Sequence, residues 1–152
     1  MCAEKRQGVL EFVRRHLKAE VLLYDTRPEA LSRVEPLVQR WGREDSNSEA
    51  ERFAVLRDIS GSDLAGLKIL DMAAGCGNFV LQGSLQGLDV TGIEPEQWKL
   101  DLIHQKIEVY GLDASWNSRI VDGVGEKMPF PDNSFDIVDS WQTMEHVQDL
   151  DK

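Results

Sequence analysis

Several features that would place a chain in common protein classes are scarce in this sequence of 152 residues. Its two cysteines, Cys2 and Cys76, lie far apart, and no CxxC pair or His/Cys cluster accompanies them. The sequence therefore indicates neither a disulfide framework nor a zinc site, and we expect no metal. No apolar run approaches the roughly 18 residues of a membrane span, and Glu11 interrupts the apolar stretch after the charged start. We expect no membrane contact and a cytoplasmic location.

Basic residues are also too few for general binding to nucleic acid. The chain has 17 Lys and Arg against 27 Asp and Glu, a formal net charge of −10. Because binding to a phosphate backbone depends on Lys and Arg displacing counterions, this charge predicts that nucleic acid is not a partner. The length fits one domain with a sizeable core.

The first third of the chain has the apolar spacing of helices. A stripe recurs at three- and four-residue intervals between Leu10 and Tyr24, and a second follows Pro28, with a kink or break expected at Pro36. Ser48 and Glu51 fit a capping box ahead of a third stripe, and the polar stretch 42–47 is the expected hinge. We assign residues 1–62 to an N-terminal helical cap.

From about residue 67 the pattern changes to short apolar strands that alternate with helices. Strands are predicted at 68–72, 89–93, 118–121 and 135–139, with helices at 78–86, at 96–110 and from 144. Strands that are apolar throughout are typical of a parallel sheet covered by helices on both faces. The predicted fold class is α/β, a doubly wound parallel sheet over residues 63–152.

A glycine turn between the first predicted strand and its helix is a candidate ligand site. Gly75 and Gly77 leave the backbone open to a ligand and direct helix N-terminal amides toward it. Glu94 ends the second strand 19 positions after Gly75, where a carboxylate can accept both hydroxyls of a ribose. The alternatives are that the glycines only form a tight turn and that Glu94 is solvated before Pro95.

The residues around the turn distinguish between nucleoside ligands. A dinucleotide site needs a third glycine at position 80, which is Val80 here, so a nicotinamide-dependent oxidoreductase is disfavoured. Asp71, four residues before Gly75, would repel a pyrophosphate but can accept a hydrogen bond from an ammonium group. S-adenosylmethionine carries an ammonium, a sulfonium and a ribose, and has no phosphate.

At these positions the sequence resembles class I S-adenosylmethionine-dependent methyltransferases, with a Rossmann-like fold. The resemblance covers roughly residues 64–152, whereas the preceding helices are similar only to the variable cap of such enzymes. Four segments carry it: Ile69-Leu70-Asp71-Met72-Ala73-Ala74-Gly75-Cys76-Gly77, Gly92-Ile93-Glu94-Pro95, residues 126–138, and Met144-Glu145-His146-Val147.

The resemblance implies roles for individual residues. The residues implied at the methionine part of the cofactor are Asp71, Ala73, Gly75 and Gly77, and the residue implied at the ribose is Glu94. The adenine would lie beside Pro95 with residues 96–98, and beside Gly125 and Glu126. The residues implied to face the methyl group are Ser140 and Trp141. Two positions depart from the family pattern. Ala73 replaces the first glycine, and Val124 stands where an acid often contacts adenine, so that contact is lost or supplied by Asp122.

Other residues near these motifs have a structural and a functional interpretation. Cys76 is expected to be a small apolar filler rather than a reactive thiol. Trp98 either stacks on adenine or lies on the helix surface, and Phe130 and Phe135 are expected to pack beneath the loop. His146 is the candidate catalytic base, with a helix start of no catalytic duty as the alternative.

The predicted function is S-adenosylmethionine-dependent methyl transfer to a small-molecule acceptor, whose identity the motifs do not specify. The alternative is a non-catalytic module that binds the nucleoside or a partner without turnover. The resemblance implies three further strands, so the strand at 135–139 would otherwise be an exposed apolar edge. We therefore expect an incomplete methyltransferase domain whose edge is covered by a missing C-terminal half or by a homodimer.

Overall fold

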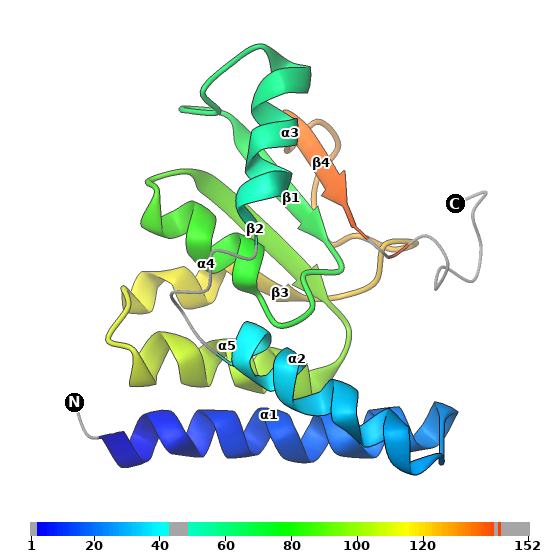
Figure 1. Ribbon diagram of the computed structural model, residues 1–152. Coiled ribbons are helices and arrows are strands. Elements are labelled where there is room, and N and C mark those ends of the chain that lie inside the picture. The colour runs from blue at the N-terminus through cyan, green and yellow to red at the C-terminus, as the bar shows by residue number, and fades with distance from the viewer. Residues whose placement is uncertain (1–2, 43–48, 142, 144–152) are drawn as a thin grey trace.

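The structure, a computed structural model, describes residues 3–42, 49–141 and 143. Its centre is a four-stranded sheet with the order β3-β2-β1-β4, in which every pair is parallel (Figure 1). The strands are β1 (Lys68–Met72), β2 (Asp89–Glu94), β3 (Ile120–Asp122) and β4 (Ile137–Ser140). The predicted α/β fold with a parallel sheet is confirmed.

The strand register brings the predicted site residues to one edge of the sheet. Asp71 on the inner strand β1 lies opposite Gly92 on β2 and Asp139 on β4. Glu94 ends β2 opposite Asp122 of β3. Because carboxyl ends of neighbouring parallel strands meet at the same edge, this is where a ligand is expected in an open α/β sheet.

Three helices pack on one face of the sheet: α3 (Ala50–Ser60), α4 (Asn78–Leu85) and α5 (Gln97–Val109). All three contribute side chains to a buried cluster with Ile69 of β1 and Val90 of β2. The opposite face is met by the segment after β3, since a Cβ placed on Gly125 would lie 3.0 Å from Sδ of Met72. The sequence predicted helices on both faces; in the described part of the chain this segment contacts the second face instead.

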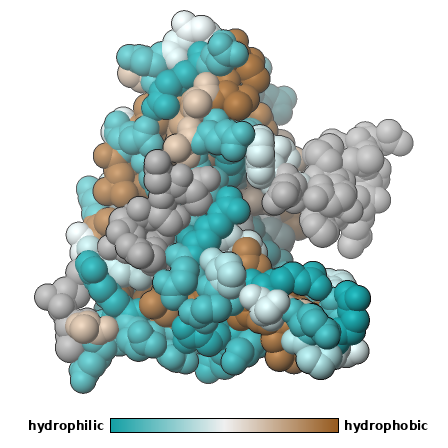
Figure 2. Space-filling model, viewed as in Figure 1, coloured by the Kyte–Doolittle hydropathy of each residue, from teal (hydrophilic) through white to brown (hydrophobic). Residues whose placement is uncertain are grey.

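Two further helices and a 3-10 turn form a second layer below α5 (Figure 1). They are α1 (Ala3–Tyr24), η1 (Pro28–Arg33) and α2 (Val34–Trp41). Val9 and Val13 of α1 pack with Val38 of α2 and Leu102 of α5 in a separate buried cluster. The outward surface of these helices is mainly hydrophilic, as Figure 2 shows, so α1 and α2 are amphipathic as predicted.

The structure adds detail at two helix starts. The predicted break near Pro36 is present: the stretch after Pro28 is divided into η1, which ends at Arg33, and α2, which begins at Val34. Pro36 therefore lies in the first turn of α2, where its missing N–H leaves no hydrogen bond unmade. Glu49 precedes α3 and makes no side-chain cap hydrogen bond; Ser48 lies outside the described residues, so the predicted capping box stays a prediction. Gly61 follows the last residue of α3 with φ of 64°, a left-handed conformation that glycine adopts readily at a helix end.

The position of α3 bears on the domain boundary. Phe53 and Leu56 of α3 belong to the cluster of the sheet, not to that of α1 and α2. The boundary at residue 62 remains a prediction, but packing places α3 with the sheet. Of the predicted hinge, only Gly42 is described.

The strands β3 and β4 begin at Ile120 and Ile137, later than the predicted starts at residues 118 and 135. The stretch before β3 is the 3-10 helix η3 (Ala114–Arg119), whose first turn is capped by the Asp113 side chain accepting from the N–H of Ser115.

Phe130 and Phe135 pack edge to face with centroids 4.9 Å apart, as expected for residues that stabilise the loop before β4. Among the described helices, none is both long and apolar enough to cross a bilayer.

Candidate functional site

The turn after β1 adopts a conformation that depends on small residues. Ala73, Gly75 and Gly77 all have positive φ, at 62°, 56° and 74°. A Cβ on Gly77 would lie 2.6 Å from Cγ1 of Ile103, so only glycine fits between this turn and α5. A Cβ on Gly75 would meet no atom within 4 Å, so its side of the turn is open to a ligand.

Glu94 joins the end of β2 to this turn. Its carboxylate is 2% exposed and accepts hydrogen bonds from the N–H of Gly75 at 2.8 Å and from the N–H of Glu96 at 3.0 Å. Burial raises the pKa of Glu94, while Lys99 and the two N–H groups act in the opposite direction. The structure thus brings together the two residues, Gly75 and Glu94, that the sequence spacing paired.

Asp71 is the other buried acid of the site, and its partner was not predicted. Asp71 is 1% exposed, and Oδ1 accepts from Nη2 of Arg52 at 2.6 Å. Arg52 also donates through Nε to Asp139 at 3.0 Å and through Nη1 to Glu49 at 3.1 Å. Its guanidinium lies 4.1 Å from the ring centroid of Phe79.

The sequence did contain a signal for Arg52. It precedes Phe53 and lies four residues before Leu56, so it falls beside the apolar face of α3. A charged residue at such a position is expected to reach a buried partner.

The other carboxylate oxygen of Asp71 is buried without a hydrogen-bond partner among the described residues. Burial raises the pKa of Asp71 to about 7, with further contributions from Asp139 and Glu49, and Arg52 only partly opposes this. Oγ of Ser140, whose residue lies opposite Met72 in the register, is likewise buried and unpartnered. A buried unsatisfied polar atom costs about 1–3 kcal/mol, so the unpartnered oxygen of Asp71 favours a ligand that carries a donor group.

The remaining described residues of the predicted site follow the carboxyl ends of β2, β3 and β4. Pro95 is exposed directly after Glu94, and Trp141 follows β4 with 47% of its surface exposed. Gly125 and Glu126 form a tight loop closed by an antiparallel bridge between the residues on either side of them. His146 lies outside the described residues, so its proposed role as a base stays a prediction.

Trp98 and Cys76, two residues beside the motifs, pack against other parts of the protein. Trp98 stacks on His16 of α1 with ring centroids 5.0 Å apart, and its Nε1 donates to Glu96. This arrangement favours packing against the N-terminal helices over stacking on adenine. Cys76 is buried, and burial raises its pKa to about 12, which confirms the expected unreactive filler.

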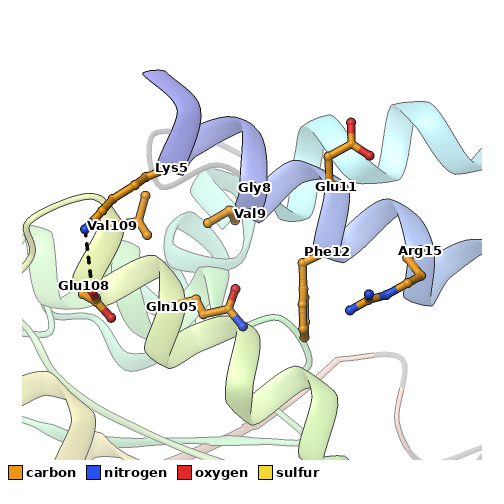
Figure 3. A pocket seen from close by; sticks show the side chains of 9 residues that line it. All are labelled: Lys5, Gly8, Val9, Glu11, Phe12, Arg15, Gln105, Glu108 and Val109. Carbon is orange, nitrogen blue, oxygen red and sulfur yellow. Dashed lines mark ion pairs between the residues drawn. The ribbon is translucent and has the colours of Figure 1, made fainter. Parts of the chain in front are cut away.

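A separate groove of about 530 Å³ lies between α1 and α5 (Figure 3). Phe12 and Val9 of α1 and Gln105 of α5 line it, and an ion pair of 4.0 Å between Lys5 and Glu108 spans one end. None of its lining residues belongs to the site at the ends of β1 and β2.

Comparison with known proteins agrees with the site geometry. The family model described as a methyltransferase domain matches residues 70–152. The chain is 30% identical over 130 residues to a ubiquinone biosynthesis O-methyltransferase of Pseudomonas entomophila (strain L48), which is 78% of this chain and 52% of that protein. This chain thus spans about half the length of the ubiquinone biosynthesis O-methyltransferases that it matches.

Two shorter matches come from proteins named as uncharacterized methyltransferases. C1B3.06c of Schizosaccharomyces pombe is 35% identical over 92 residues, covering 54% of this chain and 31% of that protein. YcgJ of Bacillus subtilis (strain 168) is 28% identical over 85 residues, covering 56% and 32%.

Proposed function

This chain belongs to the methyltransferase-domain family, and from that premise we propose that it binds S-adenosylmethionine and transfers its methyl group to a small-molecule acceptor. The observations that carry the proposal are the buried, unpartnered oxygen of Asp71 on β1 and the open side of Gly75 in the turn that follows this strand. A ligand with an ammonium group would satisfy that oxygen, and the resemblance of the motifs assigns Asp71 to the methionine part of such a ligand.

The described residues fit this cofactor at both of its ends. Glu94 is buried at the end of β2 with its carboxylate already oriented by two backbone N–H groups. Each carboxylate oxygen has a second lone pair, so Glu94 can accept ribose hydroxyls without releasing the turn. Arg52 keeps Asp71 and Asp139 in place by bridging β1 and β4 from α3.

When bound, S-adenosylmethionine supplies an activated methyl group on a positively charged sulfur. The task of this chain is then to position the nucleoside, exclude water and orient the acceptor toward the methyl group. Ser140 and Trp141, at the end of β4, are the residues we place on the acceptor side. His146 remains our candidate for the base that an oxygen acceptor requires near neutral pH.

The names of the longer relatives favour an oxygen atom on a small molecule as the acceptor. The non-catalytic alternative keeps nucleoside binding but lacks turnover, and a methyl-transfer assay beside a binding assay separates the two. A cytoplasmic location remains our prediction from the sequence.

Calorimetric titration with S-adenosylhomocysteine, and separately with NAD, tests the proposal. We expect binding of the first and not of the second. Glu94→Ala should weaken S-adenosylhomocysteine binding by about 1.5–3 kcal/mol, the usual contribution of a hydrogen bond to a charged group. Glu108→Ala, an exposed acid on α5, is the matched control and should leave the affinity unchanged. Equal affinity of wild type and Glu94→Ala would refute the ribose assignment.

We also propose that the outer edge of β4 pairs with a strand from elsewhere in a longer chain or from a second copy. In the described part of the chain no strand pairs with the outer side of β4, whose Val138 is 56% exposed, and an open apolar edge is a template for pairing. Val138→Lys should reduce self-association measured by size exclusion, whereas Val55→Lys on the exposed side of α3 should not. A wild-type chain that runs as a monomer and binds no hydrophobic dye would contradict this proposal.

A further inference from the structure

The end of α2 is held by three side chains from the sheet domain. The last carbonyls of a helix have no partner within it. Here the carbonyl of Arg40 accepts from Nδ2 of Asn78 at 2.9 Å, and that of Trp41 accepts from Nζ of Lys106 at 2.9 Å. The carbonyl of Gly42 accepts from the hydroxyl of Tyr110 at 2.6 Å. Three successive carbonyls therefore accept hydrogen bonds from side chains that lie 38, 65 and 68 positions away in the sequence.

Lys106 extends this connection to the glycine turn. Its side chain is fully buried, and Nζ also donates to the carbonyl of Cys76 at 3.0 Å and to Oδ1 of Asn78 at 2.6 Å. One ammonium group thus joins α5, the turn and the end of α2. The partial negative charge at a helix C-terminus stabilises a cation placed there.

The hydrogen bond from Lys106 to the carbonyl of Cys76 acts on the glycine turn itself, because Cys76 lies between Gly75 and Gly77. Gly75, on one side, has its N–H held by Glu94, and Gly77, on the other, packs against Ile103. The carbonyl between them faces Lys106. The turn that we assign to the nucleoside is therefore fixed by β2, by α5 and, through Lys106, by the N-terminal helices.

We propose that Lys106 is a positioning residue for the nucleoside site, and that it couples nucleoside binding to the order of the end of α2. The inference rests on the proposed function, because it concerns affinity for the same ligand. Without the ammonium, the Cys76 carbonyl loses a donor and the turn can rotate away from the conformation that presents its N–H groups. The end of α2 loses its connection to the turn at the same time.

The test compares Lys106→Met with Tyr110→Phe. Each removes a hydrogen bond to the end of α2, from Lys106 in α5 or from Tyr110 just after it, but of the two residues Lys106 is the one that donates to the turn. With both variants folded by circular dichroism, calorimetry with S-adenosylhomocysteine should show at least about fivefold weaker binding for Lys106→Met and less than about twofold change for Tyr110→Phe. Equal affinities, or equal losses in both variants, would overturn the inference.

Hydrogen exchange of the wild-type chain provides a second readout that needs no variant to fold. S-adenosylhomocysteine should slow exchange of the amide of Gly42, which donates to Val38 at the end of α2, as well as amides of the turn. Protection confined to the turn would overturn the coupling. A wild-type chain with no affinity for S-adenosylhomocysteine would refute the proposed function itself, whereas binding that is indifferent to Lys106 would refute this inference alone.

Discussion

Asp71 should make the affinity for S-adenosylhomocysteine depend on pH. Its carboxylate is buried, and its pKa is raised from 3.8 to about 7, mainly by burial. A bound ammonium group favours the charged form of Asp71, so binding is strongest where Asp71 is ionised and weakens as pH falls below about 7. The effect has this sign because protons and the ammonium compete for the same carboxylate.

The magnitude follows from the pKa. Returning it to the ordinary value would contribute at most about 4 kcal/mol, because one pKa unit corresponds to about 1.4 kcal/mol. Below about pH 7 the affinity should fall up to about tenfold per pH unit, so between about pH 8 and about pH 5.5 the loss approaches about 30-fold. The amino group of the ligand stays protonated over most of this range.

Calorimetry across this pH range, with wild type, Asp71→Asn and Asp58→Asn, measures the effect. Asp71→Asn should bind more weakly at high pH and show a flat profile, since the titrating group is gone. Asp58, on the exposed side of α3, is the control, and its variant should reproduce the wild-type profile. A wild-type profile that is flat, or that remains in Asp71→Asn, would refute the role of Asp71.

Two further predictions concern the stability of the turn and of the core. Gly77→Ala should destabilise the fold by about 1–3 kcal/mol more than Gly87→Ala, because both glycines have positive φ but only a Cβ at Gly77 would meet Ile103. Urea unfolding of the two variants compares their stabilities directly, and equal losses would exclude the steric reason. Phe53→Ala should cost about 3–5 kcal/mol in the same measurement, since Phe53 is 1% exposed and stacks on a second core ring; a loss below about 1 kcal/mol would contradict the packing of α3 on the sheet.

The sheet and the pair Gly75 and Glu94 could be predicted from sequence because both follow from local patterns. Short apolar strands that alternate with helices place successive strand ends at one edge, and the spacing of 19 residues puts an acid beside the turn. The position of Asp71 could be predicted in the same way, because it lies on the first strand four residues before Gly75.

Arg52 and Lys106 could not be placed in the same way, because their partners are distant in sequence. Arg52 joins Asp71 and Asp139, which lie 19 and 87 positions away, and such contacts appear only once the helices are packed. Lys106 lies three residues after Ile103 and four before Tyr110, so it shares a face of α5 with them, but its acceptors on other elements cannot be read from the sequence.

Details at the element ends depended on competing interactions. Glu49, at the start of α3, accepts from Arg52, and Trp98 stacks on His16 of α1; no local pattern indicates either contact.

A structure solved with S-adenosylhomocysteine tests the central claim most directly. The account predicts the ligand ammonium within hydrogen-bond distance of Asp71 and both ribose hydroxyls on Glu94. A nucleoside bound elsewhere, such as in the groove between α1 and α5, with both acids still untouched, would contradict it.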